Sequence, residues 1–345
     1  MVALSFRSPA RRMRGMAARS HRRPARRARN AGRLGVFVCL LLMLAGCGGA
    51  ETRQAQGNAA LTVTDFAGRE VRLAERPKRI VALSNGETNI VYALGGEVVG
   101  RPTSATPLAD EAAEKAAEIG TAHEVNLEKI ALLRPDVVLG NDPMNAKDVP
   151  ALEGLGTKVV LTSANTIAEI ERQITLFGQL LGKEEKAAEL VAGIEAEKRQ
   201  TATASAGSKP RVLLVYGAPG TFMAALPSSL GGDILEAAGG ANVAADFPRL
   251  QSYPQYAQLS AERIVEADPQ IIFIMTHGSP EEVEDHFRAE MRKNAAWSSV
   301  QAVRNGRVEV LPSDLFGSSP GHRVTEALRM MREKLATVSS EPADE

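Results

Sequence analysis

Two histidines stand where an open α/β sheet would present side chains to a ligand. His277 follows the apolar run Ile271–Ile274 and precedes Pro280, so it lies on a loop at the carboxyl end of an expected strand. His123 lies just before Asn126, which is expected to cap a helix. Imidazole is a strong ligand for iron and other transition metals. The pattern therefore predicts a pair of loops able to hold a metal-containing ligand.

Strand-loop-helix units position these loops. Arg79–Leu83 has the pattern of a buried strand, and Thr88–Leu94 has helical spacing that ends at Gly95. Asn126 caps an expected helix, Leu127–Leu133, and a strand over Asp136–Leu139 follows Pro135. The first half of the chain is therefore built from α/β units.

The same order returns later as an internal repeat. Arg211–Val215 is an expected strand, and Gly232–Gly239 an expected helix with its glycine stop. Ser260 is expected to cap a helix, Ala261–Ala267, which is followed by Pro269 and the strand Ile271–Ile274. The offset from the first copy is 134 residues, both from Asn126 to Ser260 and from Pro135 to Pro269. Two α/β lobes of like topology follow, and two facing lobes can enclose a ligand.

A helical stretch separates the repeats. Residues 166–205 are strongly helical with one break at Gly182, and the second half places Ala187, Leu190, Val191 and Ile194 on one face. A crossing by one long helix predicts a stiff joint and slight closure on binding. The expected domains are a signal peptide (1–46), a tether (47–60), an N-lobe (61–165), linking helices (166–205), a C-lobe (206–338) and a polar tail (339–345).

The N-terminus carries a targeting signal. Arginines crowd residues 7–33, and the apolar run 36–46 is shorter than the roughly 20 residues that span a bilayer. The run ends at Cys47 in a Leu-Ala-Gly-Cys sequence that resembles the lipobox of bacterial lipoproteins, which implies a lipidated Cys47; an uncleaved anchor is the alternative. The other cysteine, Cys39, lies inside the apolar run, so the mature chain has no internal disulfide.

The charge distribution argues against a nucleic-acid partner. The formal net charge is +0, but the chain is clearly acidic once the arginine-rich leader is removed. Binding to phosphates needs a persistent basic surface. Nothing in the sequence indicates an obligate oligomer, and a monomer is expected.

Taken together, these stretches resemble the iron-complex and cobalamin branch of ABC-importer binding proteins, and most closely the haem-receptor lipoproteins of Gram-positive bacteria. The likeness rests on the lipobox, the repeat and the segments Val99–Thr103, Glu118–Gly120, Lys209–Leu214, Gly231–Val243 and His277–Val283. The resemblance implies two Rossmann-like lobes joined by one spine helix, as in class III periplasmic binding proteins. It also implies a lipid-anchored extracytoplasmic protein that is not an enzyme, uses no catalytic cofactor and carries haem to a permease and its ATPase.

The resemblance also implies ligands for the haem iron. Haem receptors of this kind hold iron between a methionine and the histidine of a His-Gly-x-Pro-Glu-Glu motif. The histidine matches His277, whereas the methionine position falls on His123. A second imidazole in place of a thioether would stabilise ferric iron.

Further site residues are expected around this pair. Arg101, helped by Thr103 and Ser104, is the candidate partner for porphyrin carboxylates, and Tyr253 and Tyr256 are candidate cleft residues and reserve iron ligands. Relatives present one glutamate per lobe to the permease. Glu236 matches in the C-lobe, whereas the N-lobe position is Asn89, so Glu87 is the expected substitute.

Other ligands and functions remain open. A ferric siderophore is the main alternative cargo, with cobalamin third. A bare zinc or manganese site would need more converging ligands than the histidines after residue 47 provide, namely His123, His277, His286 and His322. A secreted metal-dependent hydrolase using His123, His277 and His322 is the alternative of another class, but no His-Glu-x-x-His, Gly-x-Ser-x-Gly or P-loop motif supports it.

Overall fold

The computed structural model describes residues 61–104, 106–121, 123–204, 209–218, 221–277 and 279–339. Residues 56–345 form a compact unit of their own, separate from 1–55. The predicted signal peptide, Cys47 and the tether lie outside the described residues, as does most of the predicted tail.

The N-lobe is built on a parallel sheet, as expected. Its strand order is β5-β4-β3-β6-β7, and a small antiparallel hairpin, β1-β2, precedes it. The bounds are Leu61–Thr64 (β1), Glu70–Leu73 (β2), Ile80–Ala82 (β3), Gly100–Arg101 (β4), Ala117–Glu118 (β5), Val137–Asn141 (β6) and Lys158–Thr162 (β7).

Short helices connect these strands. The helix after β3 begins earlier than the spacing predicted, because Ser84 caps it and Glu87 completes a capping box. The bounds are Asn85–Ala93 (α2), Glu111–Lys115 (η1), Leu127–Leu133 (α3), Ala146–Asp148 (η2) and Val149–Gly154 (α4).

The C-lobe repeats this plan with an added antiparallel edge. Its strand order is β11-β9-β8-β12-β13, with β10 also paired to β8. The strands β8, β10, β12 and β13 run parallel, whereas β9 and β11 are antiparallel to their neighbours. The bounds are Arg211–Ala218 (β8), Thr221–Ala225 (β9), Ala241–Asn242 (β10), Tyr256–Gln258 (β11), Ile271–Met275 (β12) and Val308–Val310 (β13).

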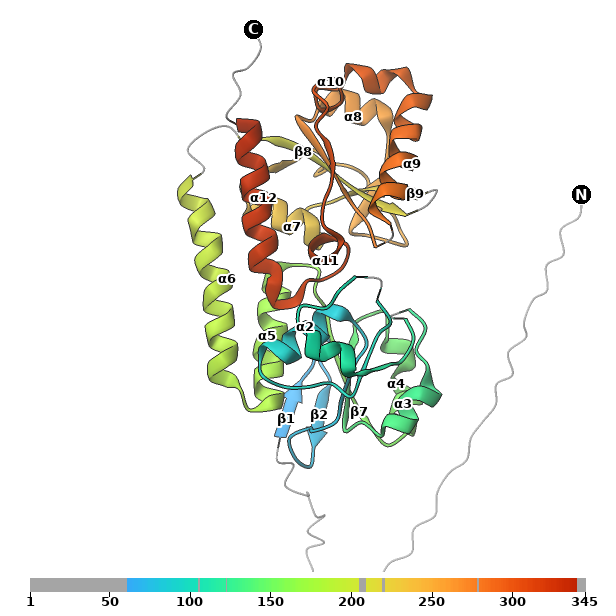
Figure 1. Ribbon diagram of the computed structural model, residues 1–345, viewed down its shortest axis with the longest axis vertical. Coiled ribbons are helices and arrows are strands. Elements are labelled where there is room, and N and C mark those ends of the chain that lie inside the picture. Colours follow the sequence, from blue (N-terminus) through green and yellow to red (C-terminus); the bar gives the residue numbers. More distant parts are fainter. Residues whose placement is uncertain are drawn as a thin grey trace, which may run out of the picture. The chain divides into compact units, whose positions relative to one another are not determined.

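Helices of the C-lobe follow the same strand-helix alternation (Figure 1). Their bounds are Leu230–Ala237 (α7), Ala261–Ala267 (α8), Pro280–Lys293 (α9), Ala295–Ser299 (η3), Gln301–Arg304 (α10), Ser313–Phe316 (α11), Gly321–Arg323 (η4) and Val324–Ser339 (α12).

The internal repeat is confirmed down to the helix caps. Helices α3 and α8 have the predicted bounds, with Asn126 and Ser260 as N-caps. Both end on a left-handed residue that is not glycine, Arg134 with φ 45° and Asp268 with φ 36°. Since non-glycine residues rarely adopt this conformation, its recurrence 134 residues later marks two copies of one unit.

The linking segment is a helix pair, α5 (Ile167–Leu181) and α6 (Glu184–Ala204). Gly182 ends α5 in the left-handed conformation at φ 64°, which confirms the predicted break. Helix α6 packs against α5 and, farther along its length, against α12 and α7 of the C-lobe (Figure 1). One apolar cluster includes Val63 of β1, Ile194 of α6 and Leu328 of α12. The lobes therefore share a continuous core along the linking helices.

A second contact between the lobes was not expected from the sequence. The short helix η4 lies against α2 of the N-lobe, and the side-chain amide of Asn89 donates to the Pro320 carbonyl at 3.4 Å. Gly321 has φ 62°, and a Cβ there would lie 2.6 Å from the carbonyl oxygen of Gly86. Backbone therefore meets backbone at this point, and neither glycine leaves room for a side chain.

Candidate functional site

His123 lies on a short loop that a bridge closes. Gly120 pairs with Val125 across the loop, and the amide of Glu124 donates to the Thr121 hydroxyl at 3.2 Å. Asn126 then starts α3 by accepting from the amide of Lys129 at 2.9 Å. The imidazole of His123 is exposed at the end of this loop.

His277 lies two residues beyond β12, at the carboxyl end of the parallel strands. Ser279 caps α9 behind it by accepting from the amide of Glu282. The side chain reaches solvent, yet surrounding protein lowers the pKa of His277, and the charge of His123 lowers it further. Both effects favour the neutral imidazole, which is the form that binds metal.

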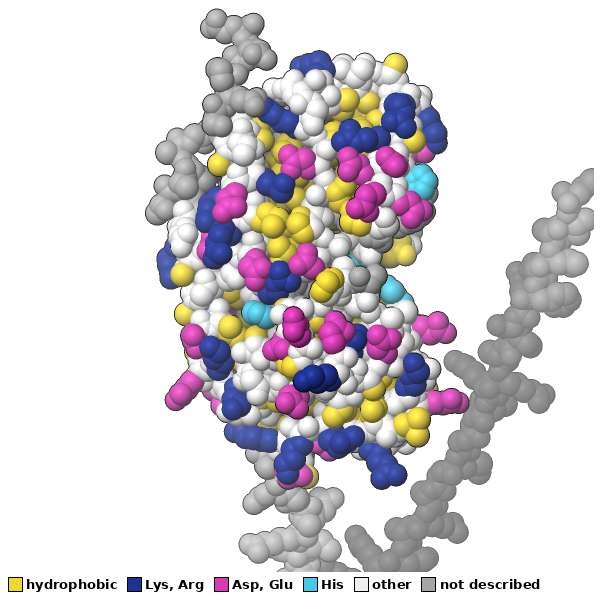
Figure 2. Space-filling model, in the orientation of Figure 1, with side chains coloured by type: hydrophobic (Ala, Val, Ile, Leu, Met, Phe, Trp, Pro, Cys, Tyr) yellow, Lys and Arg dark blue, Asp and Glu magenta, His cyan; other side chains and the backbone are white. Residues whose placement is uncertain are grey.

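The electrostatic effect of His123 on the pKa of His277 indicates that the two side chains lie near each other. They come from different lobes and are far apart in sequence, but each imidazole lies within electrostatic range of the other. Figure 2 shows histidine side chains beside a hollow in the surface. The loops that carry His123 and His277 thus come from different lobes and lie within electrostatic range of each other.

Aromatic rings line the C-lobe side of this site. The ring of Tyr216 on β8 lies 5.4 Å from the His277 ring, edge to face, and 5.3 Å from the ring of Tyr256. Burial raises the pKa of Tyr256 to about 12 and also raises the pKa of Tyr216. Tyr253 is 57% exposed and acts electrostatically on Tyr216. Because iron binds tyrosine as phenolate, these environments favour His277 over Tyr256 as the metal ligand.

Tyr216 was missed in the sequence. It pairs with Met275 across the parallel β8 and β12 strands, and Met275 stands two residues before His277. Only the register of two strands that are distant in sequence brings the rings together. Phe222, in contrast, packs on Phe287 in the C-lobe core.

Polar groups on the N-lobe side form a small network. The Ser104 hydroxyl accepts from the side-chain amide of Asn85 at 2.6 Å and from the amide of Thr106 at 3.1 Å. The side-chain oxygen of Asn85 is buried and has no partner among the described residues. Thr103 is exposed and donates to Glu118 at 3.1 Å. The Ser104 hydroxyl also donates to the Thr106 carbonyl at 2.9 Å, so Asn85, Thr103 and Ser104 are bonded within their own lobe near the carboxyl end of β4.

Arg101 is not available to a ligand, which corrects the expectation from the sequence. Its side chain is buried (6% exposed) and pairs with Glu114 and Glu118. Its guanidinium also donates to the carbonyls of Ala113 and Pro102, each at 3.1 Å. A guanidinium surrounded by acceptors of its own lobe holds the loop from 102 to 118 in place and leaves no free fork for a carboxylate.

The position of Glu87 also does not fit the docking role expected from the sequence. It is 1% exposed, and its carboxylate accepts from the amides of Leu83 and Ser84, each at 3.1 Å, and from the Thr162 hydroxyl at 3.3 Å. Burial raises its pKa to about 7. The side chain thus points into the N-lobe, because the capping box folds it back toward its own N-cap. Glu236 on α7, by contrast, is exposed.

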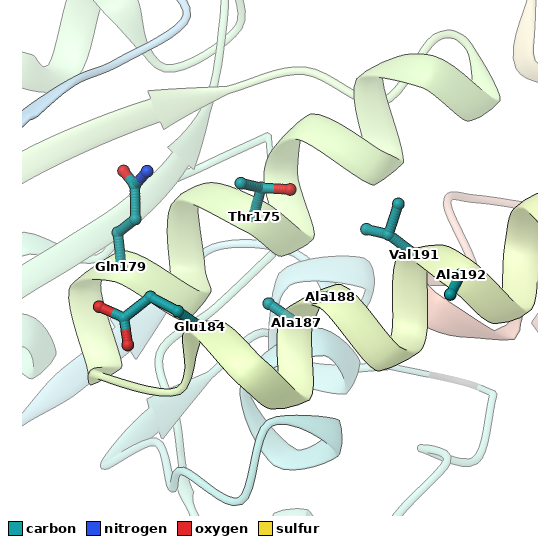
Figure 3. Close-up of a pocket in the computed structure, with 7 residues that line it drawn as sticks. All are labelled: Thr175, Gln179, Glu184, Ala187, Ala188, Val191 and Ala192. Carbon is teal, nitrogen blue, oxygen red and sulfur yellow. The ribbon is translucent and has the colours of Figure 1, made fainter.

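An apolar groove lies elsewhere, between α5 and α6 (Figure 3). It has a volume of about 450 Å³ and is lined by Thr175, Gln179, Glu184, Ala187, Ala188, Val191 and Ala192. None of these residues belongs to the loops that carry His123 and His277, so we assign the groove no ligand. Among the described helices, none is long and apolar enough to cross a membrane.

Comparison with known proteins gives consistent matches. The family model described as periplasmic binding protein matches residues 80–315. The chain is 30% identical over 241 residues to the high-affinity heme uptake system protein IsdE of Staphylococcus aureus, a match that covers 69% of this chain and 80% of that protein.

Solved structures give a similar result. An ABC transporter substrate-binding protein from Listeria monocytogenes superimposes with a TM-score of 0.66 at 29% identity, covering 76% of this chain and all of that one. The structure of S. aureus IsdE complexed with heme superimposes with a TM-score of 0.65 at 26% identity, covering 74% of this chain and 98% of that one.

Proposed function

The chain belongs to the periplasmic binding protein family, and on this premise we propose that it binds haem between its lobes and delivers it to the permease of an ABC importer. Members of this family are extracytoplasmic solute-binding proteins and not enzymes. The likeness to the S. aureus haem uptake protein supports iron porphyrin as the cargo.

The observation that carries the proposal is that His277 and His123, which come from opposite lobes, lie near enough to interact electrostatically. The surroundings of His277 lower its pKa and so favour the neutral, metal-binding ring. Two imidazoles on opposite sides of a flat iron porphyrin can bind its two axial positions and favour its ferric state. Tyr216 and Tyr256 offer aromatic surface beside the same position.

The remaining roles are proposed from the sequence and from which side chains are exposed. Tyr253 is exposed and offers a hydroxyl to a porphyrin carboxylate, whereas Thr103 and Ser104 would bind it by exchanging their present bonds to Glu118 and to the Thr106 carbonyl. Glu236 is the proposed contact to the permease on the C-lobe. Cys47 is the proposed site of the lipid that anchors the chain to the cell membrane, and the proposed working form is a monomer.

A haem titration tests the proposal. We would use a chain that begins at Gly48, which retains the whole compact unit 56–345. Ferric haem is added to this protein and to its His123→Ala and His277→Ala variants, with His286→Ala as the matched control on exposed α9. We expect one haem per protein, a weaker or five-coordinate complex in the first two variants, and no change in the control.

A ferric siderophore is the alternative cargo if the protein does not bind haem. A siderophore-binding protein bound to acinetobactin and ferric iron shares the fold, at 21% identity and a TM-score of 0.65. Loose haem binding that neither His123→Ala nor His277→Ala alters would reject haem, and a panel of ferric siderophores would then be titrated.

A further inference from the structure

Among the residues that the structure describes, His277 has no hydrogen-bonded partner of the kind that a metal-binding histidine usually has. A ligating imidazole commonly donates its second N–H to a carboxylate or carbonyl, which fixes the direction of the ring and raises its basicity. Within the described part of the chain, no side chain or carbonyl accepts a hydrogen bond from the His277 ring, and its contact is the Tyr216 ring. The loop alone would leave the ring free to turn about its side-chain bonds.

Tyr216 is well placed to restrict that rotation. Its ring centroid lies 5.4 Å from that of His277 at an interplanar angle of 69°, within the range of a favourable edge-to-face pair. Tyr216 stands on β8, which lies between β9 and β12 in the sheet, so its backbone is fixed on both sides. The ring of His277 therefore packs against a side chain whose backbone is held by the sheet.

A second ring supports the first from behind. The Tyr256 ring on β11 lies 5.3 Å from that of Tyr216 at an interplanar angle of 49°. Tyr256 is half-buried, and its backbone pairs with that of Ala225 on β9, so it too is held by the sheet. The three rings form a row, Tyr256, Tyr216 and His277, that runs from the sheet edge to the proposed iron position.

We infer that Tyr216 is a positioning residue, which sets the plane of the His277 imidazole by ring contact in place of a hydrogen bond. This inference rests on the proposed function, since it assigns how one axial ligand is held. It also suits a carrier. A ring contact orients the imidazole without adding the basicity that a carboxylate partner would give, so the iron–nitrogen bond stays weak enough for the haem to be released.

The aromatic ring and the hydroxyl of Tyr216 can be tested separately. Tyr216→Phe keeps the ring and removes the hydroxyl, whereas Tyr216→Leu and Tyr216→Val remove the ring and retain apolar volume that a strand tolerates. Tyr92→Leu is the matched control, because it removes a half-buried tyrosine of α2 that has no contact with either histidine among those the structure describes. Each variant is loaded with ferric haem.

Two readouts are taken on the loaded proteins. The electron paramagnetic resonance g-values of low-spin ferric haem report the orientation of the axial imidazole planes, which a change in stability alone leaves unaltered. The rate of haem transfer to excess apomyoglobin reports how firmly the iron is held. We expect Tyr216→Phe and Tyr92→Leu to match the wild type, and the ring-free variants to show shifted g-values and a transfer rate about 10-fold higher.

The outcomes separate the inference from the proposed function. If the wild type shows no low-spin spectrum with two nitrogen ligands, the haem proposal fails whatever Tyr216 does. If the wild type shows it and both ring-free variants keep the wild-type g-values and transfer rate, the positioning role is overturned while haem binding stands. If Tyr216→Leu fails to fold, the g-values and transfer rate of Tyr216→Val decide between these outcomes. If Tyr216→Phe shows shifted g-values, the effect belongs to the hydroxyl, and the inference is also overturned.

Discussion

Replacing Glu87 with glutamine isolates the free energy of a carboxyl group buried beneath α2. Burial raises its pKa from 4.5 to about 7, although the Ser84 side chain, the amides of Leu83 and Ser84 and the Thr162 hydroxyl all favour the ionised form. The unfolded chain releases this proton near pH 4.5, whereas the folded chain keeps it up to about pH 7. The folded state therefore binds more protons than the unfolded state between these pH values.

The sign of the effect follows from this difference. Where the folded state binds more protons, the free energy of unfolding falls as the pH rises. One pKa unit corresponds to about 1.4 kcal/mol, so the wild type should lose about 3 kcal/mol through this group between pH 4.5 and pH 7.5. Glutamine does not titrate in this range, and it can still accept from the amides of Leu83 and Ser84.

The assay is urea unfolding of the wild type and Glu87→Gln at several pH values. The difference between their free energies of unfolding removes the contribution of every other titrating group. We expect this difference to move in favour of Glu87→Gln by about 3 kcal/mol across the window. Glu236→Gln, which removes an exposed carboxylate on α7, is the control for the loss of a charge that is not buried. A flat difference for Glu87→Gln would refute the argument that burial holds the proton.

Two other substitutions test the contacts that the structure assigns. Gly321→Ala should destabilise the fold more than Gly306→Ala, because both glycines have φ above 60° but only a Cβ at Gly321 meets a backbone oxygen, 2.6 Å away. Gly306→Ala should lower the free energy of unfolding by about 1 kcal/mol. Equal losses for the two variants in urea unfolding would contradict a tight contact between η4 and α2. Arg101→Met should lower it by about 2 to 3 kcal/mol, because Glu114, Glu118 and two carbonyls lose their donor, while haem affinity stays within about 2-fold. A selective loss of haem affinity in Arg101→Met would restore its predicted role at the ligand.

Local signals predicted much of the fold. Asn126 and Ser260 as helix caps, the prolines nine residues after them and the apolar runs that follow are short-range features, and the structure places α3, α8, β6 and β12 where these features indicate. The offset of 134 residues then revealed the two lobes, because a duplicated unit repeats its caps as well as its strands.

Side-chain direction was harder to predict. Glu87 and Arg101 are charged residues near loops, and charge alone suggests exposure. Glu87 turns inward because Ser84 and Glu87 cap the same helix end. Arg101 turns inward because Glu114 of η1 and Glu118 of β5, two short elements that the sequence did not predict, approach its guanidinium. Which way a polar side chain points depends on partners that tertiary folding brings close.

Contacts between segments that are far apart in the chain could not be predicted from the sequence. Tyr216 meets His277 through the register of β8 and β12, and η4 meets α2 only after the chain has passed through both lobes. The histidine pair was proposed from the resemblance to haem receptors, and its place at element ends, where a ligand is expected, agrees with that proposal.

The most direct test of the central claim is the visible and electron paramagnetic resonance spectrum of the wild-type protein with one equivalent of ferric haem. If His123 and His277 bind the iron from opposite lobes, we expect a stoichiometric, low-spin ferric complex with two nitrogen ligands. A high-spin spectrum, or a tyrosinate-ligated one, would contradict the claim that these two imidazoles hold the iron.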